Sequence, residues 1–473
     1  MSAARAIGLF LSALFLVSCT SYSGPAVPSP ALTAAPDPCP VLLQAAAQHA
    51  AVGERSEQEA ALQDAAAACP GDPAPFLHLA ALYLEWNRLE EGMAAVDRAE
   101  RLGAAPLAVQ VLRTAFYAAL GDWRQVVACG ELALEMDPAN VSVWHQVALA
   151  YVVQERVGDA RGAYGALLQL APGDGLARAR LGVLLALYDP AAALAYVQDV
   201  DSPLAVDLTS LLAADHDDPD YLLARIGQVC LAHDEPALAG VVLRRVVNHH
   251  PTYADAQALL GQALGQLGRT GEALEHLELA VDLAPDSGLA RSLLGLYWLQ
   301  EGDFSRARLH LEAAYDLDPE NPALALAIAE VYVGLGRYDV AAIWIDEATR
   351  QAPSDPAVWE QAARFYLDRR TGEGMRDVGA AQTLVALAPE SATAHDLLGW
   401  ACFLTGQPAA AEVYLCQAVE LDPHLALAHY HLGQLYAYLG RGAEAREALS
   451  LALDCNTDPA LRLEIETALS AAP

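Results

Sequence analysis

The chain contains 473 residues, of which 54% are hydrophobic, 7% aromatic and 18% charged; 60 acidic and 27 basic residues, all of the latter arginine, give a net charge of −33. An apolar fraction this high excludes a disordered acidic tail, which would be poor in apolar residues. The negative charge argues against binding to bare nucleic acid, because each uncompensated carboxylate repels phosphate. At roughly 150 residues per domain the length suggests about three domains, unless the chain is a repeat array.

Residues 1–18 are predicted to be a secretory signal peptide. One positive residue, Arg5, precedes the apolar run Ala6–Val17, and a small residue stands before the expected cleavage point. The run has 12 residues, against the roughly 20 that a membrane-spanning helix needs.

The sequence Leu-Val-Ser-Cys at residues 16–19 resembles the bacterial lipobox. The resemblance implies that Cys19 is the lipid attachment site of a membrane-anchored lipoprotein, which faces the extracytoplasmic side of the cell envelope. The alternative is an ordinary secretory signal in which the position of Cys19 is accidental. Residues 19–38 are rich in Ser, Thr, Pro, Ala and Gly, a composition that predicts a flexible linker after the lipid.

The rest of the chain repeats one unit of about 34 residues. A representative unit, residues 254–287, predicts two helices joined by a glycine-rich turn. Small residues such as Gly261 and Ala273 let two antiparallel helices approach closely, and large residues such as Leu264 and Leu277 fill the remaining space. A proline, which cannot continue a helix, closes most units: Pro138, Pro172, Pro251, Pro285, Pro319, Pro353, Pro389 and Pro423.

This pattern resembles the tetratricopeptide repeat (TPR) family over roughly residues 39–473. The resemblance implies an all-α fold, a TPR alpha-solenoid in which antiparallel helix pairs form a right-handed superhelix. We expect about twelve units, which begin near residues 39, 73, 107, 141, 175, 220, 254, 288, 322, 356, 392 and 426. The predicted organisation is an N-terminal TPR array (39–202), an irregular junction (203–219), a C-terminal TPR array (220–458) and a capping helix (459–473).

Two cysteines bracket the first predicted hairpin. Cys39 and Cys69 each precede a proline, and the two ends of an antiparallel hairpin lie side by side. Export would place them where disulfides persist, so we predict a Cys39–Cys69 disulfide; the alternative is two independent buried thiols. A second bridge, between Cys402 and Cys416, is left open.

The sequence offers no pattern typical of a cofactor, metal or catalytic site. It contains no phosphate-binding glycine loop, no nucleophile elbow, no C-x-x-C and no zinc-protease motif. The acidic loop Asp215–Asp220 lacks the ordered spacing of a calcium loop. His395 and His429 occupy equivalent positions in adjacent repeats, which indicates structural repetition. We therefore expect no cofactor, no metal and no enzymatic activity.

In the TPR family the first helix of each repeat lines a concave groove that binds partner helices or peptides. Carried over position by position, the resemblance implies a groove site in the last two full repeats, formed by Asp396, Trp400, Phe403, Tyr430, Gln434 and Tyr438. The alternative is that these aromatic residues only pack repeat against repeat.

The expected function is a protein–protein interaction scaffold for an apolar or weakly basic protein segment. The membrane is reached through the N-terminal lipid only, and nucleic acid is not a partner. The alternatives are an envelope enzyme subunit or glycan-binding factor that uses the groove aromatics, and a structural spacer.

Overall fold

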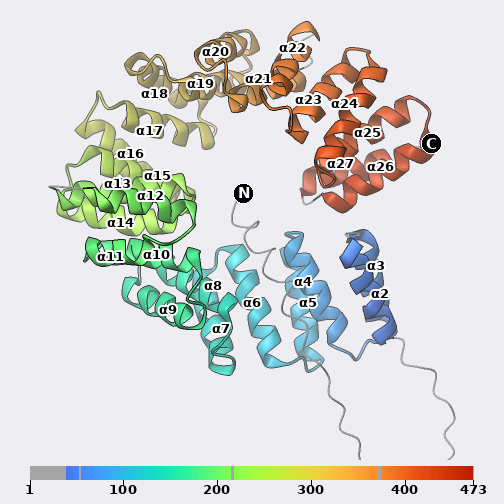
Figure 1. Ribbon diagram of the computed structural model, residues 1–473, viewed down its shortest axis with the longest axis horizontal. Coiled ribbons are helices and arrows are strands. Elements are labelled where there is room, and N and C mark those ends of the chain that lie inside the picture. Colours follow the sequence, from blue (N-terminus) through green and yellow to red (C-terminus); the bar gives the residue numbers. More distant parts are fainter. Residues whose placement is uncertain (1–38, 53–54, 215–217, 370–373, 457, 472–473) are drawn as a thin grey trace, which may run out of the picture. The chain divides into compact units, whose positions relative to one another are not determined.

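The computed structural model describes 26 helices and no strand in the residues 39–52, 55–214, 218–369, 374–456 and 458–471. Contacts between residues divide the chain into two compact units, Met1–Pro251 and Thr252–Pro473. In both units consecutive helices pair as antiparallel hairpins, and neighbouring hairpins stack in chain order (Figure 1). Cys19 and the predicted signal peptide lie outside the described residues, as does part of the Asp215–Asp220 loop.

From residue 39 on, the described part of the first unit contains six helix pairs and one additional helix, α12. In chain order its helices are α2 (Cys39–Val52), α3 (Arg55–Ala68), α4 (Ala74–Glu85), α5 (Leu89–Arg101), α6 (Pro106–Leu120), α7 (Trp123–Met136), α8 (Val141–Val153), α9 (Val157–Leu170), α10 (Gly175–Ala186), α11 (Pro190–Val197), α12 (Pro203–Ala213), α13 (Pro219–Ala232) and α14 (Pro236–His249).

The second unit contains six helix pairs and the C-terminal helix α27. Its helices are α15 (Ala254–Gln266), α16 (Thr270–Leu283), α17 (Gly288–Gln300), α18 (Phe304–Leu317), α19 (Pro322–Gly334), α20 (Tyr338–Gln351), α21 (Pro356–Arg369), α22 (Gly374–Leu387), α23 (Ala392–Leu404), α24 (Pro408–Leu421), α25 (Ala426–Tyr438), α26 (Gly442–Cys455) and α27 (Pro459–Ala471).

The all-α architecture of paired helices agrees with the fold class expected from the sequence. Each of the twelve expected starting points falls within one residue of the first helix of a pair. None of the helices in the described part of the chain has the length and apolar character that crossing a membrane requires.

The junction predicted at residues 203–219 contains a packed helix. Residues 203–213 form α12, which contacts α10, α11 and α13 and buries Leu204, Ala205 and Leu208. The stacking of helices therefore continues through this segment, and the division into compact units falls later, between Pro251 and Thr252.

The close helix approach expected at the repeat glycines is present in the structure. A methyl group added at Gly261 would lie 2.6 Å from Leu277 Cγ and 3.0 Å from the carbonyl oxygen of Ala273. Three other glycines face the leucine sixteen residues later at 2.6–2.7 Å: Gly295 with Leu311, Gly399 with Leu415 and Gly433 with Leu449. Glycine is thus needed here because the partner helix occupies the space of a side chain.

The repeat prolines also accept a hydrogen bond that the sequence did not reveal. His395 Nε2 and His429 Nε2 each donate to the carbonyl oxygen of the proline six residues earlier, at 2.9 Å. Trp144 and Trp359 use the indole N–H in the same way, also at 2.9 Å. The equivalent histidines therefore anchor the start of their helices to the preceding turn, which gives them a structural role.

Candidate partner-binding site in the last two repeats

The six groove residues predicted from the sequence lie on the first helices of the last two pairs. Asp396, Trp400 and Phe403 belong to α23, and Tyr430, Gln434 and Tyr438 belong to α25. Within each helix they are three or four residues apart, a spacing that places them on one face.

Asp396 is a buried contact between the two helices. Its Oδ1 accepts a hydrogen bond of 2.7 Å from His431 Nδ1, and the exposed fractions of the Asp396 and His431 side chains are only 1% and 8%. The second carboxylate oxygen, Oδ2, is also buried and has no hydrogen-bond partner among the described residues. The structure therefore places Asp396 beneath the surface, where it ties α23 to α25.

His431 is a site residue that the sequence reasoning missed. Its ring stacks on Trp400, with the ring centroids 4.1 Å apart and the planes inclined by 11°. The signal that could have identified it is its spacing: His431 lies 35 residues after Asp396, on the first helix of the next repeat. Hydrogen bonding on one nitrogen and stacking on one face fix the orientation of the imidazole, and with it that of Trp400.

Trp400, Phe403 and Tyr438 form a continuous row of rings that we call the aromatic surface. The centroids of Trp400 and Phe403 are 5.1 Å apart, and Phe403 meets Tyr438 edge to face at 5.4 Å. Trp400 and Phe403 are half-buried, whereas the Tyr438 side chain is 71% exposed. The row thus runs from the packed helix interface out to solvent.

Tyr430 and Gln434 border a separate pocket at the C-terminal end of the second unit. The pocket has a volume of about 450 Å³ and lies between α25, α26 and α27, with walls formed by Tyr430, Gly433, Gln434, Ala437, Leu449, Leu463, Glu464, Thr467, Ala468 and Ala471. Gln434 Nε2 donates to Tyr430 Oη at 2.7 Å. Burial, together with the nearby Glu464 carboxylate, raises the pKa of Tyr430.

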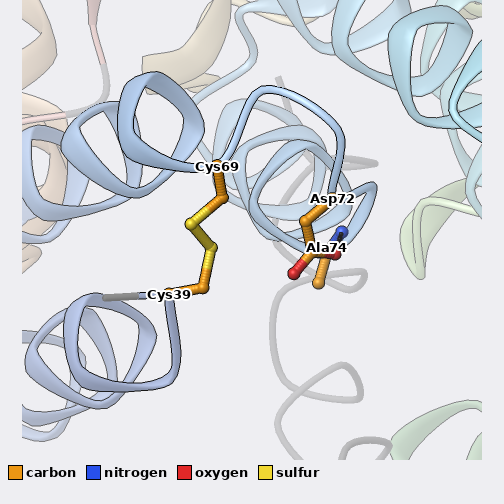
Figure 2. Close-up of a disulfide and its surroundings, with 4 residues drawn as sticks. All are labelled: Cys39, Cys69, Asp72 and Ala74. Atoms are coloured by element: carbon orange, nitrogen blue, oxygen red, sulfur yellow. Dashed lines mark hydrogen bonds between the residues drawn. A yellow bond between two sulfur atoms is a disulfide. The ribbon is translucent and has the colours of Figure 1, made fainter. Parts of the chain in front are cut away.

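Cys39 and Cys69 are joined as a disulfide that links the start of α2 to the residue after α3 (Figure 2). Their Cα atoms are 6.2 Å apart, within the range that disulfides span.

Cys402 and Cys416, whose pairing the sequence left open, are free thiols. Cys402 is buried, and Cys416 Sγ lies 3.9 Å from Tyr436 Oη. In the part of the chain that the structure describes, His, Cys, Asp and Glu side chains do not gather in threes where they could hold a metal ion.

Models of the tetratricopeptide repeat match residues 254–287, 299–364 and 392–425. The chain contains tetratricopeptide repeats. The last matched segment includes α23 and α24, so two of the three rings of the aromatic surface, Trp400 and Phe403, belong to a recognised TPR. TPR proteins bind peptides or proteins and generally act as non-enzymatic scaffolds.

Solved structures of other helical-repeat proteins are similar to this chain at low identity. Yeast Tom70 shares 15% identity over 85% of this chain and 95% of its own, with a TM-score of 0.41. PilF of Pseudomonas aeruginosa shares 18% over 44% and 94%, with a TM-score of 0.39. YrrB, a TPR protein with an unusual peptide-binding site, shares 17% over 39% and 95%, with a TM-score of 0.34. No curated protein matches the sequence.

Proposed function

We propose that the protein is a non-enzymatic protein–protein interaction scaffold that binds a partner peptide or helix on the aromatic surface. The proposal rests on the contacts that hold the Trp400 side chain in one orientation. Its ring rests flat on His431, which the buried Asp396 holds in turn. An aromatic side chain fixed in this way loses little conformational entropy when it binds, so it can serve as an anchor.

The composition of the surface supports an apolar or weakly basic partner. Its three rings offer apolar faces, and aromatic faces also attract cationic side chains. Neither α23 nor α25 carries an arginine. The surface therefore offers aromatic faces to a basic side chain without a competing positive charge on these helices, and it offers no cationic partner to an acidic one.

Site-specific photo-crosslinking in the native cell tests the proposal. A benzophenone amino acid at position 438 is expected to capture a discrete partner, and Trp400→Ala is expected to remove that product. The same amino acid at position 196 is the control, because Tyr196 is also exposed but lies in the first unit. Two outcomes would show that the aromatic surface is not the binding site: capture of the same proteins from both positions, or capture that persists in Trp400→Ala. Either outcome would favour the alternative that the protein is a structural spacer.

The proposal includes a lipid anchor at Cys19 and a location in the bacterial cell envelope. It rests on the lipobox-like sequence at residues 16–19 and on the Ser-, Thr- and Pro-rich stretch that follows. Metabolic labelling with palmitate is expected to mark the wild-type protein and not Cys19→Ser. A Cys19→Ser protein that still labels refutes this assignment.

A further inference from the structure

Three side chains of the first unit meet at an exposed tyrosine. Tyr188 lies in the turn between α10 and α11, and its side chain is 60% exposed. The guanidinium carbon of Arg161, on α9, lies 5.3 Å from the centroid of the Tyr188 ring, and that of Arg245, on α14, lies 5.2 Å away. Both distances are within the range of a cation–π contact. We call these three residues the arginine–tyrosine cluster.

The packing of the first unit holds the cluster in place. Helix α10 contacts both α9 and α14, so the turn that follows α10 lies close to the helices that carry the two arginines. Both arginines are half-buried, whereas the tyrosine between them in sequence reaches solvent. The arrangement therefore presents two partly desolvated positive charges beside an accessible ring.

Four of the other arginines that cover an aromatic ring in the described part of the chain also have a carboxylate partner, whereas Arg98, over Phe76, and Arg337, over Tyr332, do not. Arg88 covers Tyr83 and pairs with Glu91. Arg156 covers Tyr151 and pairs with Asp159 at 2.7 Å. The same combination occurs at Arg306, with Trp298 and Asp303, and at Arg441, with Tyr436 and Glu444.

Arg161 and Arg245 also lack a carboxylate partner, and both cover the same ring. Neither forms an ion pair with any of the described residues, although the chain has 60 acidic residues and only 27 basic ones. Arg245 Nε is buried and has no hydrogen-bond partner among the described residues. Asp189, the acid next to Tyr188 in sequence, uses its carboxylate to cap α11 by accepting a hydrogen bond from the backbone N–H of Ala192, at 3.0 Å. The Nη atoms of Arg245 are not among the buried unpartnered atoms, so they are the donors that the carboxylate of a partner can reach.

We propose that the arginine–tyrosine cluster is a second binding site, which takes an acidic segment of a protein. A guanidinium group binds a carboxylate through two parallel hydrogen bonds, and two guanidinium groups on separate helices suit two carboxylates of one segment. The exposed Tyr188 ring offers an apolar contact for the aliphatic part of the segment. The net charge of −33 does not prevent this binding, because at physiological salt charges beyond about 8 Å are largely screened.

Fluorescence anisotropy on the full-length protein tests the site with a fluorescein-labelled peptide of alternating Glu and Ala. The Glu-Ala peptide is expected to bind, and the matched Gln-Ala peptide is not. Arg161→Gln and Arg245→Gln should each weaken binding about tenfold or more, because each removes hydrogen bonds to a charged group. Arg245→Lys keeps the charge but loses the paired hydrogen bonds, so its effect should be intermediate.

The matched control is Arg124→Gln, which removes the same charge from an exposed position on α7 of the same unit. It should leave the affinity unchanged, and circular dichroism should show that every variant is folded. Tyr188→Ala provides an independent variant, because an exposed ring can be removed with little effect on folding. Three outcomes would each overturn the proposal. They are a loss of affinity in Arg124→Gln as large as in the cluster variants, binding of the Gln-Ala peptide as tight as that of the Glu-Ala peptide, and binding of inorganic phosphate, but not of the peptide, that depends on the two arginines.

Discussion

At the scale of single residues, the buried pair of Asp396 and His431 decides how the aromatic surface is held. Asp396→Ala leaves His431 Nδ1 without its acceptor and removes a link between α23 and α25. Loss of a buried hydrogen bond to a charged group costs about 1–3 kcal/mol. We therefore expect faster hydrogen exchange of the α25 backbone amides in this variant.

Asp316→Ala is the control for that measurement. Asp316 is exposed on α18, so its removal should leave exchange in α25 unchanged. Equal exchange in the two variants would mean that the Asp396–His431 contact does not hold the two helices together.

A second residue-scale prediction concerns Tyr151, whose hydroxyl donates a hydrogen bond to Glu131. Burial, followed by the contact with Glu131, raises the pKa of Tyr151 from 10.0 to about 12. Between pH 10 and about pH 12 the Tyr151 hydroxyl is deprotonated in the unfolded chain but stays protonated in the folded chain. The contribution of Tyr151 to the free energy of unfolding is therefore complete below pH 10 and is lost as the pH rises toward 12. Thermal unfolding measured across this range should show a smaller decrease in Tm for Tyr151→Phe than for the wild type. An identical decrease in the two proteins would contradict this account.

At the scale of helices, the contact between Gly261 and Leu277 sets how closely α15 and α16 pack. Gly261→Ala places a methyl group 2.6 Å from Leu277 Cγ, so the leucine must move, and overpacking of this kind typically costs about 1–3 kcal/mol. Gly265→Ala is a matched control on the same helix, where the new methyl group would lie 3.8 Å from Ala273 Cβ. Alanine is favoured over glycine in a helix by about 1 kcal/mol, so Gly265→Ala should raise the unfolding temperature and Gly261→Ala should lower it. Two variants that shift it in the same direction would show that close approach does not limit packing here.

The helix pairs could be predicted from the sequence because the same packing constraint recurs every 34 residues. A glycine at the close approach, a leucine opposite it and a closing proline locate several of the hairpins, including those of residues 254–287, 288–321 and 392–425, without knowledge of their neighbours. The site was harder to predict, because its contacts join different repeats: His431 reaches Asp396 across 35 residues, and Asp396 is buried although it occupies an expected groove position. The arginine–tyrosine cluster combines two helices and a turn at irregular spacings, so no repeat pattern could indicate it.

At the scale of the whole molecule, each hairpin contacts mainly its neighbours in the chain, so a local change should remain local. The Cys39–Cys69 disulfide closes the first described hairpin, which among the described residues packs mainly through α3 on α4. The loop-entropy relation gives about 3–4 kcal/mol for a loop of this length. Most of this stabilisation should act on α2 and α3, because a terminal repeat can unfold without disrupting the repeats beyond it.

We therefore expect Cys39→Ser/Cys69→Ser to lose hydrogen-exchange protection in α2 and α3, with progressively less effect from α4 onward and none in the second unit. Cys455→Ser replaces a partly exposed thiol that lies 3.7 Å from the carbonyl oxygen of Pro423 in the second unit, and it should change neither region. In the unreduced wild-type protein, thiol labelling should leave Cys39 and Cys69 unmodified. Labelling of both cysteines would show that the disulfide does not form, whereas uniform loss of protection along the chain in the double variant would show that the repeats unfold as one cooperative unit.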